Sequence, residues 1–115
     1  MTVNIYDDIN RLEASFKQTE QFEALVAAVE VVKADEEAQR LFVAFRDMQM
    51  ELQQQQAMGV DMTEEQLTEA QQVAEQAQTN EKIMAMLQAE MQLSEVLNEV
   101  NRILVKPIQD LYNGL

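Results

Sequence analysis

The sequence predicts an all-α protein: a bundle of about five helices with a protruding αα-hairpin and a long C-terminal helix, which self-associates. Apolar residues recur at intervals of three and four along nearly the whole chain, the spacing that forms one face of a helix. The 115 residues include only two glycines and one proline to interrupt it. With no Trp, four Phe and two Tyr, the core must be built from aliphatic side chains and Met.

The spacing predicts a single helical domain over residues 1–115. Its helices are expected at these ranges: 4–17, 19–33, 36–57, 64–78 and 81–106. Thr19 and Asp35 are typical N-cap residues, and either Thr79 or Asn80 is expected to cap the last helix. Pro107 is expected to end or kink that helix, because proline lacks the backbone N–H that the helix interior requires.

The clearest interruption in the pattern is at residues 58–62, which include Gly59. Thr63 follows, with Gln66 three residues later, and this pair fits a capping box at the start of a new helix. The new helix presents a seam of mostly small residues: Leu67, Ala70, Ala74 and Ala77. Small residues allow a close approach to a neighbour, so we expect this helix to fold back on residues 36–57 as an αα-hairpin.

The last helix carries more apolar surface than one partner helix needs. A second apolar face lies beside its main seam, which places the helix either at the centre of its own bundle or in a subunit interface. The sequence predicts a homodimer or a higher homo-oligomer. The residues expected to form the self-association seam are Met86, Leu93, Val96, Val100, Ile103 and Leu104.

Charge is unevenly distributed along the chain. The formal net charge is −13, and residues 47–81 contain eight carboxylates and no Lys or Arg. Nucleic acids and anionic membrane surfaces demand clustered cations, so neither is an expected partner. We call residues 47–81 the acidic arm. Two interpretations of it remain: a solvated face that keeps the protein in solution, or a surface that docks a basic protein.

The predicted hairpin is also rich in methionine. Met48, Met58 and Met62 are candidate partner-surface residues, because flexible thioethers can line an adaptable protein-binding groove. The alternative is that they fill the core. Four consecutive glutamines in the same arm, residues 53–56, fit an exposed helix face.

No constellation in the sequence indicates catalysis, and we predict no catalytic, cofactor-binding or metal-binding residues and no cofactor. The chain has no His and no Cys, which excludes di-iron Glu-x-x-His sites, cysteine–histidine zinc sites and triads that depend on histidine. The acidic pairs Asp7/Asp8, Glu36/Glu37 and Glu64/Glu65 lie near predicted helix starts. Neighbouring side chains point about 100° apart on a helix, so helix capping explains these pairs better than a cation site.

A cytoplasmic location is expected from the same composition. The absence of cysteine fits a reducing compartment. No apolar run approaches the eighteen or more residues that span a bilayer, and the first twenty residues contain acidic side chains instead of a basic start and an apolar block.

Several short elements, taken in order, resemble the YlbF/YmcA-like family, and within it the YheA-like branch of Firmicute bacteria. They are residues 19–22 (Thr-Glu-Gln-Phe), then Asp35, Ala38, Leu41, Phe42, Phe45 and Gln49, the Gln56-x-Met58-Gly59 turn, and finally Asn80, Leu87, Glu90 and Leu93. The resemblance covers nearly the whole chain. It implies an all-helical cytosolic protein that self-associates.

The same resemblance implies a role in regulation. Better-studied members act as regulatory adaptors for competence, sporulation and biofilm formation in a multi-protein complex that influences messenger-RNA processing. Some of them hold iron–sulfur clusters through cysteines, which this chain lacks, so no functional residue is carried over.

The resulting hypothesis is a non-enzymatic regulatory adaptor that works by binding other proteins. Two alternatives come from other classes: a helical enzyme whose carboxylates bind a divalent metal, and a holdase-like structural scaffold. Thermal stabilisation by a divalent ion would indicate the enzyme, and broad, unselective suppression of aggregation would indicate the holdase.

Overall fold

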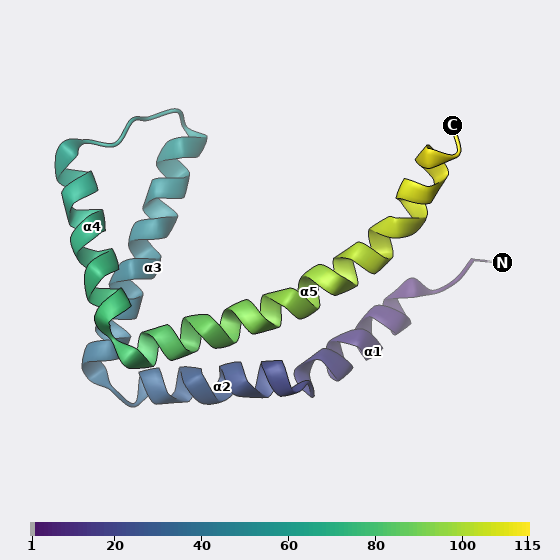
Figure 1. Ribbon diagram of the computed structural model, residues 1–115, viewed down its shortest axis with the longest axis horizontal. Coiled ribbons are helices and arrows are strands. Elements are labelled where there is room, and N and C mark those ends of the chain that lie inside the picture. Colours follow the sequence, from purple (N-terminus) through teal and green to yellow (C-terminus); the bar gives the residue numbers. More distant parts are fainter. Residues whose placement is uncertain (1) are drawn as a thin grey trace. The chain divides into compact units, whose positions relative to one another are not determined.

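The structure, a computed structural model, describes residues 2–115, and this part of the chain forms five α-helices and no strands. Figure 1 shows their order along the chain. The helices are α1 (Ile5–Lys17), α2 (Glu20–Lys33), α3 (Glu36–Ala57), α4 (Glu64–Thr79) and α5 (Glu81–Asn113). The predicted all-α class is confirmed.

The helix boundaries follow from local capping. Thr19 Oγ1 accepts a hydrogen bond from Phe22 N at 3.1 Å, and Asn80 Oδ1 accepts from the backbone N–H groups of Lys82 and Ile83. Asp35 caps α3 in the same way, accepting from the N–H groups two and three residues later. Each of these caps satisfies N–H groups that the first turn of a helix leaves without partners.

The connection between α3 and α4 is fixed at both ends. Gly59, with φ +72°, allows Val60 N to donate to Gln55 O at 2.9 Å, in the Schellman arrangement that ends many helices. At the other end, Thr63 and Gln66 form the predicted capping box, with reciprocal hydrogen bonds of 3.1 and 3.2 Å.

One predicted boundary is wrong. The last helix was expected to end near residue 106, but α5 runs through Pro107 to Asn113. Proline in a helix interior costs about 3 kcal/mol, because it removes one hydrogen bond and its ring crowds the carbonyl four residues earlier. The helix continues although nothing packs on this end of α5 within one chain to offset that penalty, since every residue from 101 to 115 is exposed.

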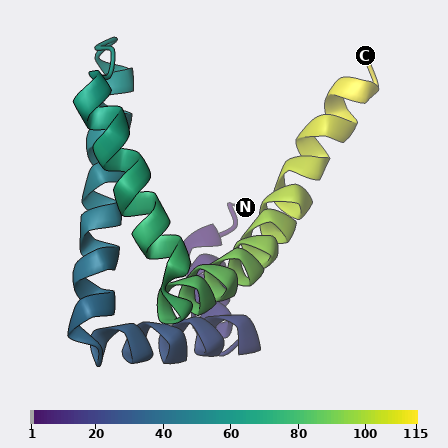
Figure 2. The same cartoon turned by 60° about the vertical axis from the view of Figure 1, so that its left-hand side comes forward.

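The chain divides into two units. One comprises residues 27–87 and contains the α3–α4 hairpin with the end of α2 and the start of α5; the other comprises residues 1–26 and 88–115. In the hairpin unit, α3 and α4 run antiparallel and contact each other (Figure 2). The buried residues of this unit are Val32, Ala38, Ala77, Ile83 and Met86.

The hairpin unit is held at its base by small and branched side chains. Ala38 and Ala77 are completely or almost completely buried, and their size lets helices approach closely. Ile83 is the largest fully buried side chain. Lys82 Nζ lies 2.8 Å from Asp35 Oδ2, so the first turn of α5 is joined to the N-cap of α3.

The terminal unit buries much less. Ala89 and Leu93 are its only buried residues among those described, and Phe16 meets Phe22 edge-on with ring centroids 5.6 Å apart. No residue of α1 is buried. From residue 101 to 115 every residue is exposed.

Candidate interaction surfaces

The end of α5 presents an apolar face with no covering element. Leu104, Ile108 and Leu111 are four and three residues apart and therefore lie on one side of the helix, and Leu115 follows two residues beyond its end. Their exposed fractions range from 51% to 100%. We call these four residues the C-terminal apolar face.

The first helix has a similar face. Ile5, Ile9 and Leu12 share one side of α1, and each is about half exposed. Short helices are marginal in water unless an apolar face packs against something, because most helical stability in proteins comes from tertiary contacts. Both faces are therefore candidate binding surfaces.

The charge near the C-terminal apolar face is close to balanced. Residues 101–115 contain Arg102, Lys106 and a single acidic side chain, Asp110. Arg102 forms an ion pair with Glu99 one turn earlier, and this interaction lowers the pKa of Glu99, chiefly through the hydrogen bond from the guanidinium. This part of the chain lacks the strong like-charge repulsion found elsewhere in the protein.

The predicted self-association residues fall into three groups in the structure. Met86 and Leu93 are buried within a single copy of the chain, and Val96 and Val100 are partly buried. Ile103 and Leu104 are exposed by 57% and 62%. Of the six residues, only this last pair is exposed, and the predicted seam did not extend to Ile108, Leu111 and Leu115 because the helix was expected to end near residue 106.

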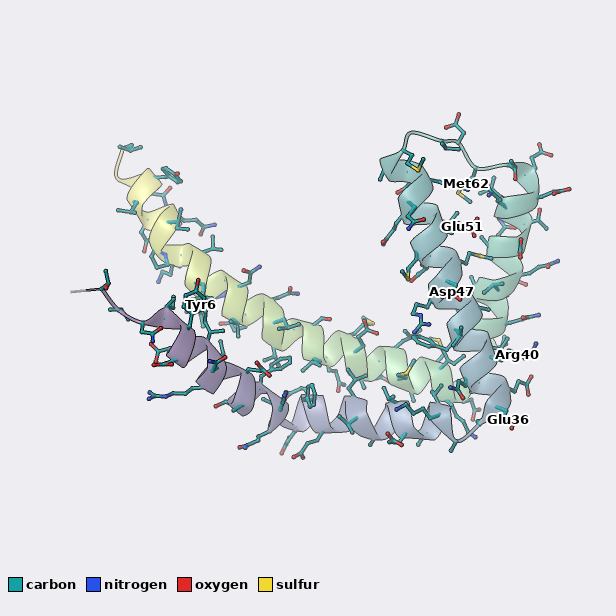
Figure 3. The ribbon with its side chains drawn as sticks, turned by 180° about the vertical axis from the view of Figure 1, so that it is seen from behind. Tyr6, Glu36, Arg40, Asp47, Glu51 and Met62 are labelled. Carbon is teal, nitrogen blue, oxygen red and sulfur yellow. The ribbon has the colours of Figure 1, made fainter. Side chains whose placement is uncertain are left out.

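The predicted partner surface lies along the hairpin, but its three methionines differ. Met58 is 77% exposed beside Gly59, whereas Met48 and Met62 are partly buried. Figure 3 shows Met62 near the turn end of the hairpin, whereas Glu51 and Asp47 of α3 lie farther from the turn. Met48, Glu51 and Leu52 of α3 line a groove of about 130 Å³ with Gln66 and Glu69 of α4.

A second groove lies at the base of the hairpin and is polar. It has a volume of about 310 Å³ and is lined by Glu37, Arg40, Leu41, Gln76, Thr79 and Asn80. Two of its polar atoms are already engaged: the Thr79 hydroxyl donates to Gln76 O, and Asn80 Oδ1 caps α5. The guanidinium of Arg40 is the one charged donor in its lining.

Asp35, at the base of the hairpin, has a pKa that its hydrogen-bond partners lower. The hydrogen bond from Lys82 lowers the pKa of the Asp35 carboxyl below its ordinary value of 3.8, and the backbone N–H of Ala38 lowers it further. Both partners favour the charged form, so the group serves to join α3 to α5.

Two further geometric findings concern metals and membranes. Within residues 2–115, no three His, Cys, Asp or Glu side chains gather closely enough to hold a metal ion. No helix in this described part of the chain is both long enough and apolar enough to cross a bilayer.

Residues 5–109 match the model of the family described as "Control of competence regulator ComK, YlbF/YmcA". A UPF0342 protein of Lysinibacillus sphaericus is 58% identical over 113 residues, covering 98% of each chain. The solved structure of yheA from Bacillus subtilis has a TM-score of 0.73 and 33% identity, and covers 96% of this chain and 100% of that one.

A more distant structural likeness is to Bacillus subtilis RicA, solved in complex with RicF. The TM-score is 0.69, the identity is 19%, and the match covers 97% of this chain and 99% of the other. At this identity the likeness concerns the fold. The resemblance to the YlbF/YmcA-like family and its YheA-like branch, inferred from the sequence, is confirmed by these comparisons.

Proposed function

The chain belongs to the YlbF/YmcA family, and from that premise we propose that it is a non-enzymatic regulatory adaptor, which self-associates through its terminal unit and binds a protein partner through its hairpin. The observation that carries this proposal is the pair of uncovered apolar faces on α1 and at the end of α5. Exposed apolar stripes of this extent on a small protein are typical of protein-binding surfaces.

A second copy of the chain is the best occupant for the C-terminal apolar face. Burying the exposed half of a Leu or Ile side chain contributes roughly 1 kcal/mol, and an isologous contact counts each residue twice. The near balance of charge in residues 101–115 lets two copies approach there. Leu104 belongs to the predicted seam, and Ile108 extends it beyond Pro107.

The hairpin is better suited to a different protein. Residues 47–81, most of which belong to the hairpin, carry eight carboxylates and no Lys or Arg, so they repel the same segment of a second copy and attract a basic partner. The presence of RicF in the complex with RicA supports partner binding as a use of this fold.

The self-association part is tested with Leu104→Glu combined with Ile108→Glu. Light scattering after size-exclusion chromatography should show a dimer or larger species for the natural chain and a monomer for the variant. A matched control, Gln109→Glu with Lys106→Gln, changes the net charge by the same amount on the polar side of α5. If the natural chain is monomeric at high concentration, or if both variants behave alike, self-association through this face is wrong.

The adaptor part is tested by capture followed by reconstitution. A tagged chain is used to recover partners from lysate of the source bacterium, beside an equally acidic helical control protein. A recovered partner, once purified, should re-form a stoichiometric complex with the natural chain and bind poorly to a variant with Met48, Met58 and Met62 replaced by Ser. Recovery of nothing beyond the control, or binding unaffected by the substitutions, would contradict the proposed use of the hairpin.

A further inference from the structure

A small groove between α3 and α4 has a size and lining that fit one side chain of another protein. Its volume of about 130 Å³ is equivalent to roughly four water molecules in the liquid. Pockets for cofactors and other small molecules usually measure about 300–1,000 Å³. The groove is therefore too small for such a ligand and large enough for the end of a long side chain.

The lining of the groove combines apolar and acidic groups. Met48 and Leu52 are partly buried and provide an apolar surface, while Glu51 and Glu69 add a carboxylate from each helix. A lysine or arginine has the matching structure, since its aliphatic stem packs on apolar groups while its cationic head reaches polar ones. The thioether of Met48 adapts to stems of different shape.

Among residues 2–115, no cation pairs with either carboxylate of the groove. The ion pairs within the hairpin unit use Glu30, Asp35 and Asp47, and neither Glu51 nor Glu69 takes part in any. No Lys or Arg occurs in residues 47–81, and the nearer arginine of α3, Arg46, lies 3.7 Å from the carboxylate of Asp47. The groove therefore keeps two unneutralised acceptors beside an apolar surface.

One wall of the groove is held in place before any ligand arrives. Gln66 lines the groove, and its side-chain oxygen accepts a hydrogen bond from Thr63 N at 3.1 Å in the capping box that starts α4. The Schellman motif at Gly59 fixes the other end of the connection. A preformed wall reduces the entropy lost when a ligand binds.

We propose that this groove receives a lysine or arginine side chain from a basic, amphipathic segment of a protein partner. This proposal rests on the proposed function and deepens it. It assigns the chemistry of the partner and the residues that bind the partner's basic side chain. The ammonium or guanidinium group lies between Glu51 and Glu69, and the aliphatic stem lies on Met48 and Leu52. The surrounding carboxylates of the hairpin attract the basic segment and speed its encounter.

The test uses the full chain and a designed helical peptide of Leu, Ala and Lys, with one Lys placed between two Leu. Binding is followed by fluorescence anisotropy of the labelled peptide. Replacing Glu51 and Glu69 by Gln should weaken binding roughly 5- to 20-fold, the range expected for losing two partly screened charge contacts. Replacing the central Lys of the peptide by Gln should weaken binding to the natural chain by a similar factor.

The matched control replaces Glu36 and Glu75 by Gln. This pair gives the same change in net charge on the same hairpin, but neither residue lines the groove. The control should bind the peptide within about twofold of the natural chain, since distant exposed charges are screened by salt. Equal weakening by both double variants would show that only the general field attracts the peptide, and would overturn the proposal.

A charge exchange gives an independent readout. Glu69→Lys should reject the Lys peptide and bind its counterpart with Glu at the central position, and failure of that exchange would contradict the assigned contact. Magnesium or calcium chloride is added separately as a probe: a rise in melting temperature that is lost in the Glu51/Glu69 variant would assign the groove to a cation instead.

These outcomes are separable from failure of the proposed function. The adaptor role fails if no protein partner is recovered and reconstituted. The groove assignment fails if a reconstituted partner binds the natural chain and the Glu51/Glu69 variant equally well, even while the Met48, Met58 and Met62 substitutions abolish capture. The melting temperature of each variant is measured first, and because both glutamates are exposed we expect it to be unchanged.

Discussion

The hairpin and the end of α5 share the same spacing of apolar residues, three and four apart, but differ in whether those residues are buried. In the hairpin unit, the helices cover one another's small residues, so Ala38 and Ala77 are buried within one chain. At the end of α5, Leu104 and Ile108 repeat at helical spacing with nothing over them. The difference shows that a periodic apolar stripe predicts a helix equally well in both regions, but does not reveal whether the stripe is covered by the same molecule.

The largest expected loss of stability comes from a substitution in the core of the hairpin unit. It is compared with a substitution in the C-terminal apolar face. Ile83→Ala removes a side chain that is fully buried, and should lower the free energy of unfolding by about 2–5 kcal/mol. Ile108→Ala, at a residue 51% exposed, should cost much less in a single chain and should weaken self-association instead. Chemical denaturation over a range of protein concentrations separates the two effects.

Equal destabilisation by the two substitutions at low protein concentration would break the comparison. It would mean that Ile108 is covered within one chain in solution.

The next largest effect is a stabilisation of the end of α5 by replacing Pro107, which lies in its exposed part. Pro107→Ala restores a backbone hydrogen bond and should stabilise the end of this helix by up to about 3 kcal/mol. Hydrogen exchange should slow for amides near residues 103–113 and stay unchanged in the hairpin. Slower exchange throughout the chain would indicate that the two regions are energetically coupled more closely than their separate packing implies.

A smaller effect is expected at the hairpin turn. Gly59 has φ +72°, so Gly59→Ala should destabilise the hairpin by roughly 1–2 kcal/mol, although no atom within 4 Å opposes the added methyl group. Gly114→Ala, in the terminal unit, is the matched control and should change the melting temperature little, because Gly114 has no such constraint. A Gly59→Ala variant as stable as the natural chain would show that the turn relaxes out of the left-handed region.

The smallest effect is a pH dependence at the base of the hairpin. Lys82 lowers the folded-state pKa of Asp35 below its ordinary value of 3.8, so the charged form stabilises the fold above that value. This contribution is lost as the pH falls from about 4 through the lowered pKa. Asp35→Asn should therefore show a shallower loss of melting temperature over this acidic range than the natural chain does.

The control for this measurement is Asp61→Asn, which changes a carboxylate in the connection that takes part in no ion pair with Lys82. If Asp35→Asn and the natural chain have parallel acid profiles, the interaction between Asp35 and Lys82 contributes nothing measurable.

Much of the fold could be predicted because it depends on neighbouring residues. The N-caps Thr19 and Asp35, the capping box of Thr63 and Gln66, and the turn at Gly59 act over two to five residues, so their side-chain and backbone chemistry determines where helices begin and end. The exception was the end of α5. Proline imposes a local penalty, which predicts an end to the helix near residue 106, but α5 continues through Pro107 to Asn113.

The candidate surfaces depended more on tertiary structure. The sequence alone determined the acidic arm, the methionines and the helical seam of the last helix. Only the packing decided that Met86 and Leu93 are buried in a single chain while Leu104 is exposed, and that Glu51 and Glu69 lie on one groove. The physical reason is that capping and periodicity are local, whereas burial and charge pairing depend on which distant helices meet.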